Sequence, residues 1–489
     1  MHLIDRIDHW ASVSPEHPAH VSGNRVLTFA QLKAQSDALA AHIHSQTAGK
    51  PGPVAVVGHK EPEMLVAFLA AVKAGRPYIP IDISVPAQRA EKILASSGAV
   101  LVLKPETIAA LNLAPAPAPE KRVEAGDPFY ILFTSGSTGE PKGVVITLAN
   151  LEAFLDWMCA EQKLPAMGEV FLNQAPFSFD LSVMDLYLSL STGGTLFSVT
   201  KDDVASLKNL YQALGRSQVS TWVSTPSFAQ MCLIERGFNQ AMLPNLRRFL
   251  FCGETLAPET ASQLLDRFPN AVVWNTYGPT EATVATTSIL VDRPVLAEFS
   301  PLPVGRAMPG TELLIIGEDG NPVPEGERGE IHIVGPNVSP GYLARPDLTA
   351  KAFYSRAGTP AYRTGDWGRC RNSLIFFEGR MDGQIKLHGY RIELGDLEAN
   401  LRALPEVADA LVLPVLKQGK VDALTAFVVP AAPVQGSEFE FSSKLKTALG
   451  QRIPVYMVPR KFRFLDAFPM TPNGKADRRK LAELLESSP

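Results

Sequence analysis

A stretch of ten residues, 134–143, has the composition of a phosphate-binding loop. It contains hydroxyl side chains, three glycines and Lys142, and it directly follows a strand candidate at 129–133. Glycines let backbone N–H groups converge on a phosphate, hydroxyls add further donors, and a lysine adds positive charge. The spacing is not that of a P-loop, because Pro141 stands where the second glycine should be. The segment is therefore a phosphate loop of another kind, or only a flexible turn.

The residue order Thr-Ser-Gly-Ser-Thr-Gly-x-Pro-Lys-Gly resembles the signature loop of the adenylate-forming superfamily, which includes acyl-CoA synthetases, luciferases and peptide-synthetase adenylation domains. Further signatures of that superfamily follow in the same order, at 277–281, 329–331 with 341–343, 362–366, 379–382 and 472–475. Six matches in order leave no room for coincidence. The resemblance implies an acid–thiol ligase that uses ATP to form an acyl-adenylate, releases pyrophosphate, and passes the acyl group to a thiol.

The same resemblance implies a nucleotide site assembled from several segments. Tyr277 would stack on the adenine, Asp366 would accept hydrogen bonds from the ribose hydroxyls, and Arg380 would contact the ribose. An aspartate after a glycine is also a common turn residue, so that role stays open for Asp366. The implied ATP-binding residues are Thr134, Ser135, Thr138, Lys142, Asn275, Thr276, Tyr277, Gly278, Pro279, Thr280, Asp366, Phe377, Glu378, Gly379, Arg380 and Lys475.

Two charged residues are the candidates for catalysis. A carboxylate and a phosphate repel each other, so positive charge must lie between them. The resemblance implies that Lys475, in a Pro-Asn-Gly-Lys turn, supplies this charge; outside such a motif it would be read as a solvated lysine. Glu281 would bind Mg²⁺, which prefers oxygen ligands, although a carboxylate at a helix start also favours the helix dipole.

Asp180 is the residue that bears on the choice of acid. It precedes a predicted helix, so its commonest role would be that of an N-cap. The alternative is a carboxylate that pairs with a substrate ammonium group. The peptide-synthetase branch of the superfamily has an aspartate here that binds the α-amino group, and most fatty acyl-CoA synthetases do not. We therefore expect an amino acid as the substrate.

The segments 173–180, 224–228, 251–254 and 386–391, with 78–80, resemble the family of D-alanine–D-alanyl carrier protein ligases over nearly the whole chain. That resemblance implies activation of D-alanine as D-alanyl-AMP, transfer to the phosphopantetheine thiol of a D-alanyl carrier protein, and supply of D-alanine to teichoic acids of the cell envelope. It implies that Asp180, Cys252, Val284 and Lys475 bind D-alanine, with Cys252 near the methyl group. Cys252 also fits the description of a small buried hydrophobic residue.

Three alternatives remain open at this point. The chain could activate another small amino acid, or it could be an acyl-CoA ligase. It could also be a catalytically silent sensor of a nucleotide or an amino acid. The intact loop at 134–143, together with Glu281 and Lys475, favours an enzyme, and ATP–pyrophosphate exchange with a panel of acids would separate these alternatives.

The elements that must position these residues follow a strand–helix alternation through the first 300 residues. Such a rhythm is typical of mostly parallel sheets covered by helices. After about residue 302, short strands separated by Gly, Pro and Asn indicate a small β-rich lobe. We therefore predict an α/β fold: a large N-terminal domain at 1–380 with that lobe, then a small, mobile α+β domain at 381–489. The resemblance makes Asp382 the hinge that swings Lys475 in for adenylation and away for thiol transfer.

Composition excludes several other classes of protein. Hydrophobic residues make up 46% of the 489 residues and the formal net charge is -4, so neither disorder nor a nucleic-acid partner is expected. Cys159, Cys232, Cys252 and Cys370 are not spaced for a zinc site. The first residues do not resemble a signal peptide and no apolar run could span a bilayer, which predicts a cytoplasmic protein without membrane insertion.

Overall fold

The structure is a computed structural model, and it describes residues 2–135, 140–381, 384–387, 390–417, 420–434, 436–469 and 478–486. Thr138, Asp382 and Lys475 lie outside the described residues. The chain divides into two compact units. Unit 1 takes its residues from Met1–Ile83, Ser97–Phe133 and Gly143–Met381, and unit 2 takes them from Ser84–Ser96, Thr134–Lys142 and Asp382–Pro489.

The largest sheet of unit 1 has nine strands, and its central strands are parallel. Two strands at one edge and the last strand at the other edge are antiparallel to their neighbours. The residues of the central strands are almost all buried, as expected for a sheet covered on both faces. In spatial order the strands are β14 (Arg306–Ala307), β13 (Thr287–Val291), β12 (Val272–Tyr277), β11 (Arg248–Phe251), β10 (Thr221–Ser224), β8 (Val170–Asn173), β9 (Thr195–Ser198), β1 (Pro18–Ser22) and β2 (Arg25–Thr28).

A second sheet has six strands with a parallel centre, and a third sheet of five strands is antiparallel throughout. The third sheet is the β-rich lobe expected from the sequence. The second sheet is β17 (Gly341–Tyr342), β7 (Lys142–Thr147), β6 (Pro128–Thr134), β4 (Tyr78–Asp82), β3 (Val54–Gly58) and β5 (Leu101–Leu103). The third is β15 (Glu312–Ile316), β16 (Gly329–Val334), β19 (Thr359–Arg371) and β18 (Phe353–Arg356), with β20 (Leu374–Arg380) paired to β19.

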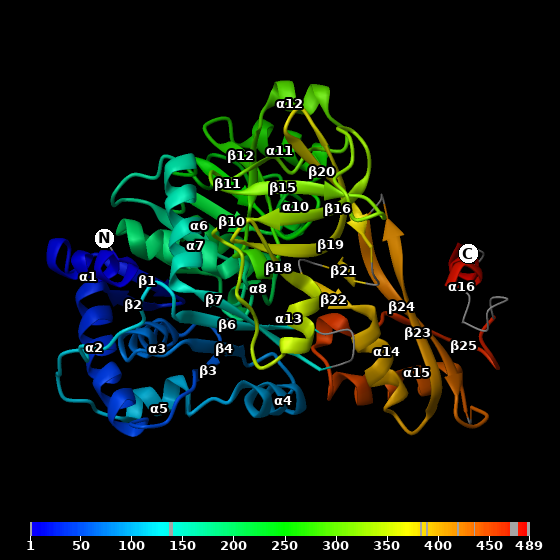
Figure 1. Ribbon diagram of the computed structural model, residues 1–489, viewed down its shortest axis with the longest axis horizontal. Coiled ribbons are helices and arrows are strands. Elements are labelled where there is room, and N and C mark those ends of the chain that lie inside the picture. The colour runs from blue at the N-terminus through cyan, green and yellow to red at the C-terminus, as the bar shows by residue number, and fades with distance from the viewer. Residues whose placement is uncertain are drawn as a thin grey trace. The chain divides into compact units, whose positions relative to one another are not determined.

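Helix α7 is buried along its whole length and α3 is buried at every residue except Glu63, so neither helix has a broad solvent-exposed face. Figure 1 shows α3 beside the strands of the second sheet and α7 beside those of the first. The helices of unit 1 are α1 (Leu3–Val13), α2 (Phe29–Gln46), α3 (Pro62–Lys73), α5 (Pro105–Ala110), α6 (Leu148–Glu161), α7 (Leu181–Thr192), α8 (Lys201–Val204), α9 (Leu207–Arg216), α10 (Pro226–Cys232), α11 (Pro258–Arg267), η1 (Thr280–Ala282), α12 (Arg293–Glu298) and α13 (Pro346–Ala352).

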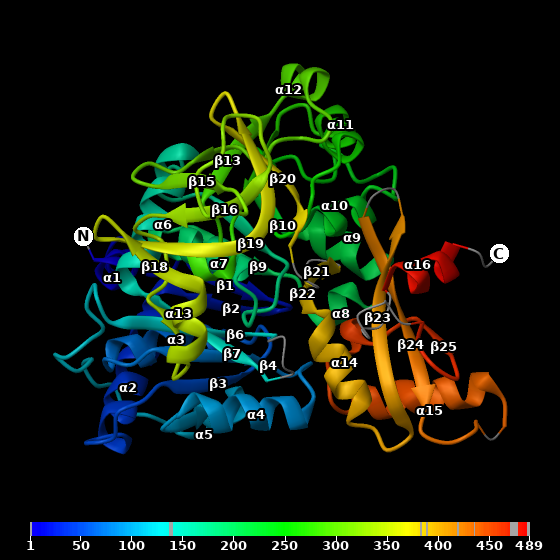
Figure 2. The ribbon, with the colours of Figure 1, turned by 45° about the vertical axis from the view of Figure 1, so that its right-hand side comes forward.

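Unit 2 has its own apolar core, in which α14 packs on β23 (Figure 2). Its strands form a three-stranded sheet, β23-β24-β25, and a hairpin, β21-β22. This α+β texture agrees with the expected small C-terminal domain. The elements are α4 (Ala87–Ser97), β21 (Gln384–Leu387), β22 (Tyr390–Glu393), α14 (Leu394–Arg402), β23 (Val407–Lys417), β24 (Lys420–Pro430), α15 (Glu438–Gly450), η2 (Val455–Met457), β25 (Lys461–Phe464) and α16 (Arg478–Glu486).

Candidate active site

The parallel strands of the largest sheet gather most of the predicted substrate residues at one edge. Strands β8, β10, β11 and β12 are neighbours and run in the same direction, so their carboxyl ends lie together. Asp180 follows β8, Cys252 follows β11 and Gly278 follows β12. Ligands of open α/β sheets bind in the crevice outside these carboxyl ends. The fold therefore provides a site at this edge, where the sequence motifs place their side chains.

Asp180 does not act as the capping residue that its position before α7 would allow. It stands at the N-cap position, but its side chain makes no capping hydrogen bond. Its carboxylate instead accepts a hydrogen bond of 2.6 Å from the hydroxyl of Thr280. Thr280 belongs to the 277–281 motif, so the predicted amino-acid residue and the predicted nucleotide motif are in direct contact.

The predicted ribose residues also form one connected group. Arg380 Nη1 donates to Asp366 Oδ1 over 2.6 Å, and Tyr277 donates its hydroxyl to the other carboxylate oxygen over 2.5 Å. The backbone N–H of Asp366 donates to Thr364 Oγ1. Burial, aided by the negative charge of Asp366, raises the pKa of Tyr277 well above its usual range, so Tyr277 remains a neutral donor. Asp366 is thus held rigidly by side chains rather than exposed in a turn.

The neighbouring residues of β20 differ in what they can offer to a nucleotide. The ring centroids of Phe377 and Tyr277 lie 6.0 Å apart. The carboxylate of Glu378 pairs with Arg328 at 3.5 Å and also with Arg369, so its charge is already used within the lobe. Gly379 has a left-handed φ of 109°, a conformation that favours glycine. Glu378 and Gly379 are therefore more suited to a backbone contact with ATP than to a side-chain contact.

The side chains of two further predicted nucleotide-binding residues form hydrogen bonds to backbone carbonyls of the protein itself. Asn275 Nδ2 donates to the carbonyl of Pro303 over 2.9 Å, and Thr276 Oγ1 donates to the carbonyl of Phe251 over 2.8 Å. Gly278 packs so closely on the segment after Glu281 that a Cβ atom there would lie 2.6 Å from Ala285 Cα. These residues shape the backbone of the motif, and Pro279 then leads directly into η1.

Glu281 is completely buried, and the hydroxyl of Tyr342 donates to its Oε1 over 2.8 Å. Among the described residues, no group of three or more His, Cys, Asp or Glu side chains could hold a metal by itself. A single carboxylate still fits Mg²⁺, because that ion is commonly held by one or two carboxylates together with substrate phosphates. The donor set at Glu281 is therefore compatible with a metal that arrives with ATP.

Cys252, which is predicted to lie near the substrate methyl, and Val284, which is also predicted to bind the substrate, lie next to each other. Cys252 Sγ is 3.5 Å from the carbonyl oxygen of Val284, and both residues are buried. A thiol and an isopropyl group would give this part of the site a small apolar wall.

The phosphate-loop residues that the structure describes belong to unit 2. Ser135 is buried, and its Oγ accepts a hydrogen bond of 3.4 Å from the backbone N–H of Glu393. The hydroxyl oxygen of Thr134 is buried without a hydrogen-bond partner within the described part of the chain. A buried hydroxyl without a partner is costly, and a ligand oxygen would satisfy it. Lys142 begins β7, whereas Thr138 and Lys475 lie outside the described residues.

One polar support of the site was missed in the sequence. Lys60 is 2% exposed, and its ammonium group donates to the carbonyls of Asn173, Gln174 and Val199 over 2.7–2.9 Å. Two of these carbonyls begin the segment that carries Asp180. Burial lowers the pKa of Lys60 to about 7. No local pattern distinguishes this lysine from a solvated one, because its acceptors lie at the carboxyl ends of β8 and β9, far away in the chain.

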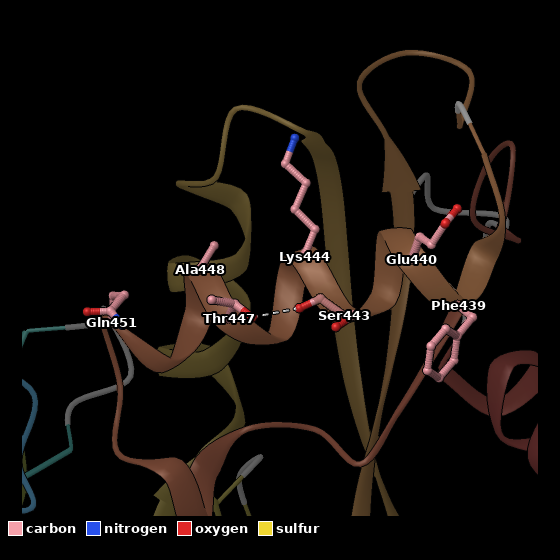
Figure 3. A pocket seen from close by; sticks show the side chains of 7 residues that line it. All are labelled: Phe439, Glu440, Ser443, Lys444, Thr447, Ala448 and Gln451. Atoms are coloured by element: carbon pink, nitrogen blue, oxygen red, sulfur yellow. Dashed lines mark hydrogen bonds between the residues drawn. The ribbon is translucent and has the colours of Figure 1, made fainter.

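A shallow pocket on α15 of unit 2 is unrelated to the predicted site (Figure 3). It is lined by Phe439, Glu440, Ser443, Lys444, Thr447, Ala448 and Gln451, and Thr447 donates to the carbonyl of Ser443 inside it. None of the residues predicted from the sequence lines this pocket. No helix in the described part of the chain combines the length and apolar character needed to cross a bilayer.

Comparison with known proteins identifies the family of the chain. The family model for AMP-binding enzymes matches residues 7–343, and that for the AMP-binding enzyme C-terminal domain matches residues 396–475. A D-alanine--D-alanyl carrier protein ligase from Bacillus cereus is 48% identical over 98% of this chain and 99% of its own.

Solved structures share the fold. The Vibrio cholerae adenylation domain AlmE, solved with glycyl-adenosine-5'-phosphate, has a TM-score of 0.86 at 23% identity, over 99% of this chain and 98% of its own. An NRPS protein containing adenylation and PCP domains has a TM-score of 0.82 at 26% identity, over 99% of this chain and 84% of its own. The chain belongs to the AMP-binding enzyme family and, within it, to the family of D-alanine--D-alanyl carrier protein ligases.

Proposed function

We propose that this chain joins D-alanine to AMP and then transfers the D-alanyl group to the phosphopantetheine thiol of a carrier protein. The observation that carries this proposal is the position of Asp180, which contacts Thr280 of the nucleotide motif instead of capping α7. A carboxylate at this point can pair with the ammonium group of an amino acid whose own carboxylate faces the nucleotide. The 48% identity to ligases of that name over 98% of the chain supports the choice of D-alanine.

In the first half-reaction, a carboxylate oxygen of D-alanine attacks the α-phosphorus of ATP, and pyrophosphate leaves. Asp180 would hold the ammonium group, and the wall of Cys252 and Val284 would face the methyl group. Asp366 would accept hydrogen bonds from the ribose, with Tyr277, Phe377 and Arg380 beside the nucleoside. Such positioning holds the carboxylate and the α-phosphate in a reactive orientation, so less entropy has to be lost during the reaction itself.

Positive charge at the reacting oxygens would come from Lys475, with Thr134, Ser135, Thr138 and Lys142 around the phosphates. Mg²⁺ held by Glu281 would neutralise phosphate charge when bound. In the second half-reaction, the thiol sulfur attacks the acyl carbon and AMP leaves. For this step we propose a large domain at 1–380 and a small one at 381–489 that turn about Asp382, so that Lys475 withdraws.

The carrier protein and the place of the reaction complete the proposal. We propose that the D-alanyl group goes on from the carrier to teichoic-acid-type polymers of the cell envelope. ATP is a cytoplasmic substrate, which favours the cytoplasm as the site of activation.

ATP–pyrophosphate exchange with D-alanine, L-alanine, glycine, D-serine and a short fatty acid tests the proposal. The strongest exchange should occur with D-alanine. Transfer is then tested by mass spectrometry of a phosphopantetheinylated carrier protein, with the apo-carrier as the control. Strongest exchange with another acid would overturn the choice of D-alanine, and no exchange with any acid would favour a non-catalytic sensor.

A further inference from the structure

The backbone next to the predicted substrate wall is strained. Thr283 and Val284 have left-handed φ angles of 52° and 69°, although both are β-branched. The N–H of Ala285 donates to the carbonyl of Thr283 over 2.8 Å, which closes a three-residue γ-turn around Val284. A γ-turn of this hand is rare, and a β-branched residue in the left-handed region is an outlier. Such strain persists only where the surrounding structure imposes it, and it clusters at functional sites.

Asn337 forms several buried hydrogen bonds to the chain around this turn. Its side chain is completely buried, and its amide nitrogen donates to the carbonyl of Ala282 over 2.8 Å and to Thr286 Oγ1 over 2.9 Å. Its backbone carbonyl accepts a hydrogen bond of 2.7 Å from Thr283 Oγ1. One buried residue therefore holds the chain on both sides of Val284. Thr311 Oγ1 lies 3.4 Å from Asn337 Oδ1 and orients the amide.

The γ-turn lies between the two halves of the candidate site. On one side, the carbonyl of Val284 contacts Cys252 Sγ. On the other side, a Cβ atom at Gly278 would lie 2.8 Å from that same carbonyl, so the turn packs on the backbone of the nucleotide motif. Val284 thus has little freedom while the turn is held. Without its buried hydrogen bonds, the turn would relax to a negative φ and move the Val284 side chain.

We propose that Asn337 is a positioning residue that determines amino-acid specificity, because it fixes Val284 in the left-handed conformation against Cys252. The proposal rests on the proposed function for the identity of the substrate. A wall that is fixed can reject a wrong substituent by steric clash, whereas a wall that yields cannot. Discrimination by one methyl group amounts to roughly 10- to 200-fold, and its loss is measurable.

The test compares Asn337→Ala and Thr286→Val with a matched control, Asn150→Ala. Asn150 donates to the carbonyls of Pro336 and Val338, which flank Asn337, but the structure gives it no hydrogen bond to the γ-turn. Thr286→Val keeps the shape of a buried residue and removes one hydrogen bond of Asn337, so it remains informative if Asn337→Ala does not fold. Folding is checked by circular dichroism.

In ATP–pyrophosphate exchange, the ratio of kcat/KM for D-alanine over L-alanine and over glycine should fall about tenfold in Asn337→Ala, and less in Thr286→Val. The KM for ATP should stay within about threefold, and Asn150→Ala should keep the wild-type ratio. A folded Asn337→Ala protein with an unchanged ratio would overturn the proposal, as would a loss of ATP affinity in step with that of the amino acid.

Hydrogen–deuterium exchange gives a readout that does not depend on the substrate. Peptides that cover 280–288 should exchange faster in Asn337→Ala than in wild type, and Asn150→Ala should leave them unchanged. If wild type prefers another amino acid, the proposed function fails, and the ratio is then taken for that amino acid. Unchanged exchange at 280–288 would overturn the role of Asn337 whatever the substrate is.

Discussion

The hydroxyl of Thr280 donates a hydrogen bond of 2.6 Å to the carboxylate of Asp180. The two residues are 100 positions apart in the chain, and each belongs to a different predicted subsite. A carboxylate has about four lone-pair sites, so this single hydrogen bond can orient Asp180 without occupying the carboxylate fully. The predicted amino-acid subsite and the predicted nucleotide subsite therefore meet in one side-chain contact.

Replacing Asp180 by asparagine should raise the KM for the amino acid far more than that for ATP. The loss of a charge-assisted bond costs about 1.5–3 kcal/mol, or roughly 10- to 100-fold in KM. Thr280→Val, which removes only the orienting donor, should raise the same KM by less than about tenfold. Steady-state ATP–pyrophosphate exchange measures both constants. Equal effects on the two substrates would contradict a role in binding the ammonium group.

Asp366→Asn should weaken the recognition of the ribose. For wild type, kcat/KM with 2'-deoxy- or 3'-deoxy-ATP should be lower than with ATP by an amount that corresponds to about 1–2 kcal/mol. The same difference should be smaller in the variant. Tyr277→Phe removes a donor to Asp366 but no charge, so its effect should be smaller. A double-mutant cycle of enzyme variant and nucleotide gives the coupling. If Asp366→Asn discriminates against the deoxynucleotides as strongly as wild type does, Asp366 does not bind the ribose. Its role would then be structural, through its hydrogen bonds to Arg380 and Tyr277.

Removal of the Tyr342 hydroxyl should lower the affinity for the divalent metal that we propose Glu281 binds. Tyr342→Phe takes away a buried hydrogen bond of 2.8 Å from Glu281, and loss of such an outer partner weakens metal binding by about 10-fold or more. Mn²⁺ binding in the presence of ATP, followed by electron paramagnetic resonance, gives a readout besides activity. Tyr354→Phe is the matched control, since Tyr354 contacts His332 instead. Equal Mn²⁺ affinities in wild type and Tyr342→Phe would argue against this role.

Lys475→Ala should abolish adenylation, with a loss of at least about 1,000-fold in exchange rate, because no other charge is expected between the two anions. ATP binding, measured by calorimetry, and the melting temperature should change little. Lys480→Ala, an exposed lysine on α16, serves as the control and should remain active. Adenylation that survives in Lys475→Ala would show that the charge comes from another residue.

His20 should make the protein sensitive to mild acid. Burial lowers its pKa from 6.5 to about 3, so the unfolded state takes up a proton at a higher pH than the folded state does. The stability that comes from the neutral, buried imidazole of His20 is fully present above about pH 6.5. As the pH falls from there towards 3, the free energy of unfolding decreases by about 1.4 kcal/mol per pH unit. Urea unfolding at several pH values should show a flatter pH dependence in His20→Gln. His44→Gln, at an exposed position, should keep the wild-type slope.

Much of the fold follows from local sequence patterns. The strand–helix alternation predicted for the first 300 residues is confirmed by elements such as β3, α3 and β11, because apolar runs and their polar boundaries are local properties. The hairpin of β1 and β2 lacks such a local signal. Its strands are only five and four residues long, and buried and exposed residues do not alternate regularly along either strand.

The sequence by itself determined the class of chemistry, because the residue types and order of the 134–143 loop and the later motifs are one-dimensional facts. Only the tertiary structure decided that Asp180 bonds to Thr280 rather than to α7, that Asp366 is held by Tyr277 and Arg380, and that Lys60 and Asn337 support the site. These contacts join residues far apart in the chain, so they depend on strand order and register. The left-handed turn at Val284 opposes the local preference of a β-branched residue, and buried hydrogen bonds from distant residues such as Asn337 hold it.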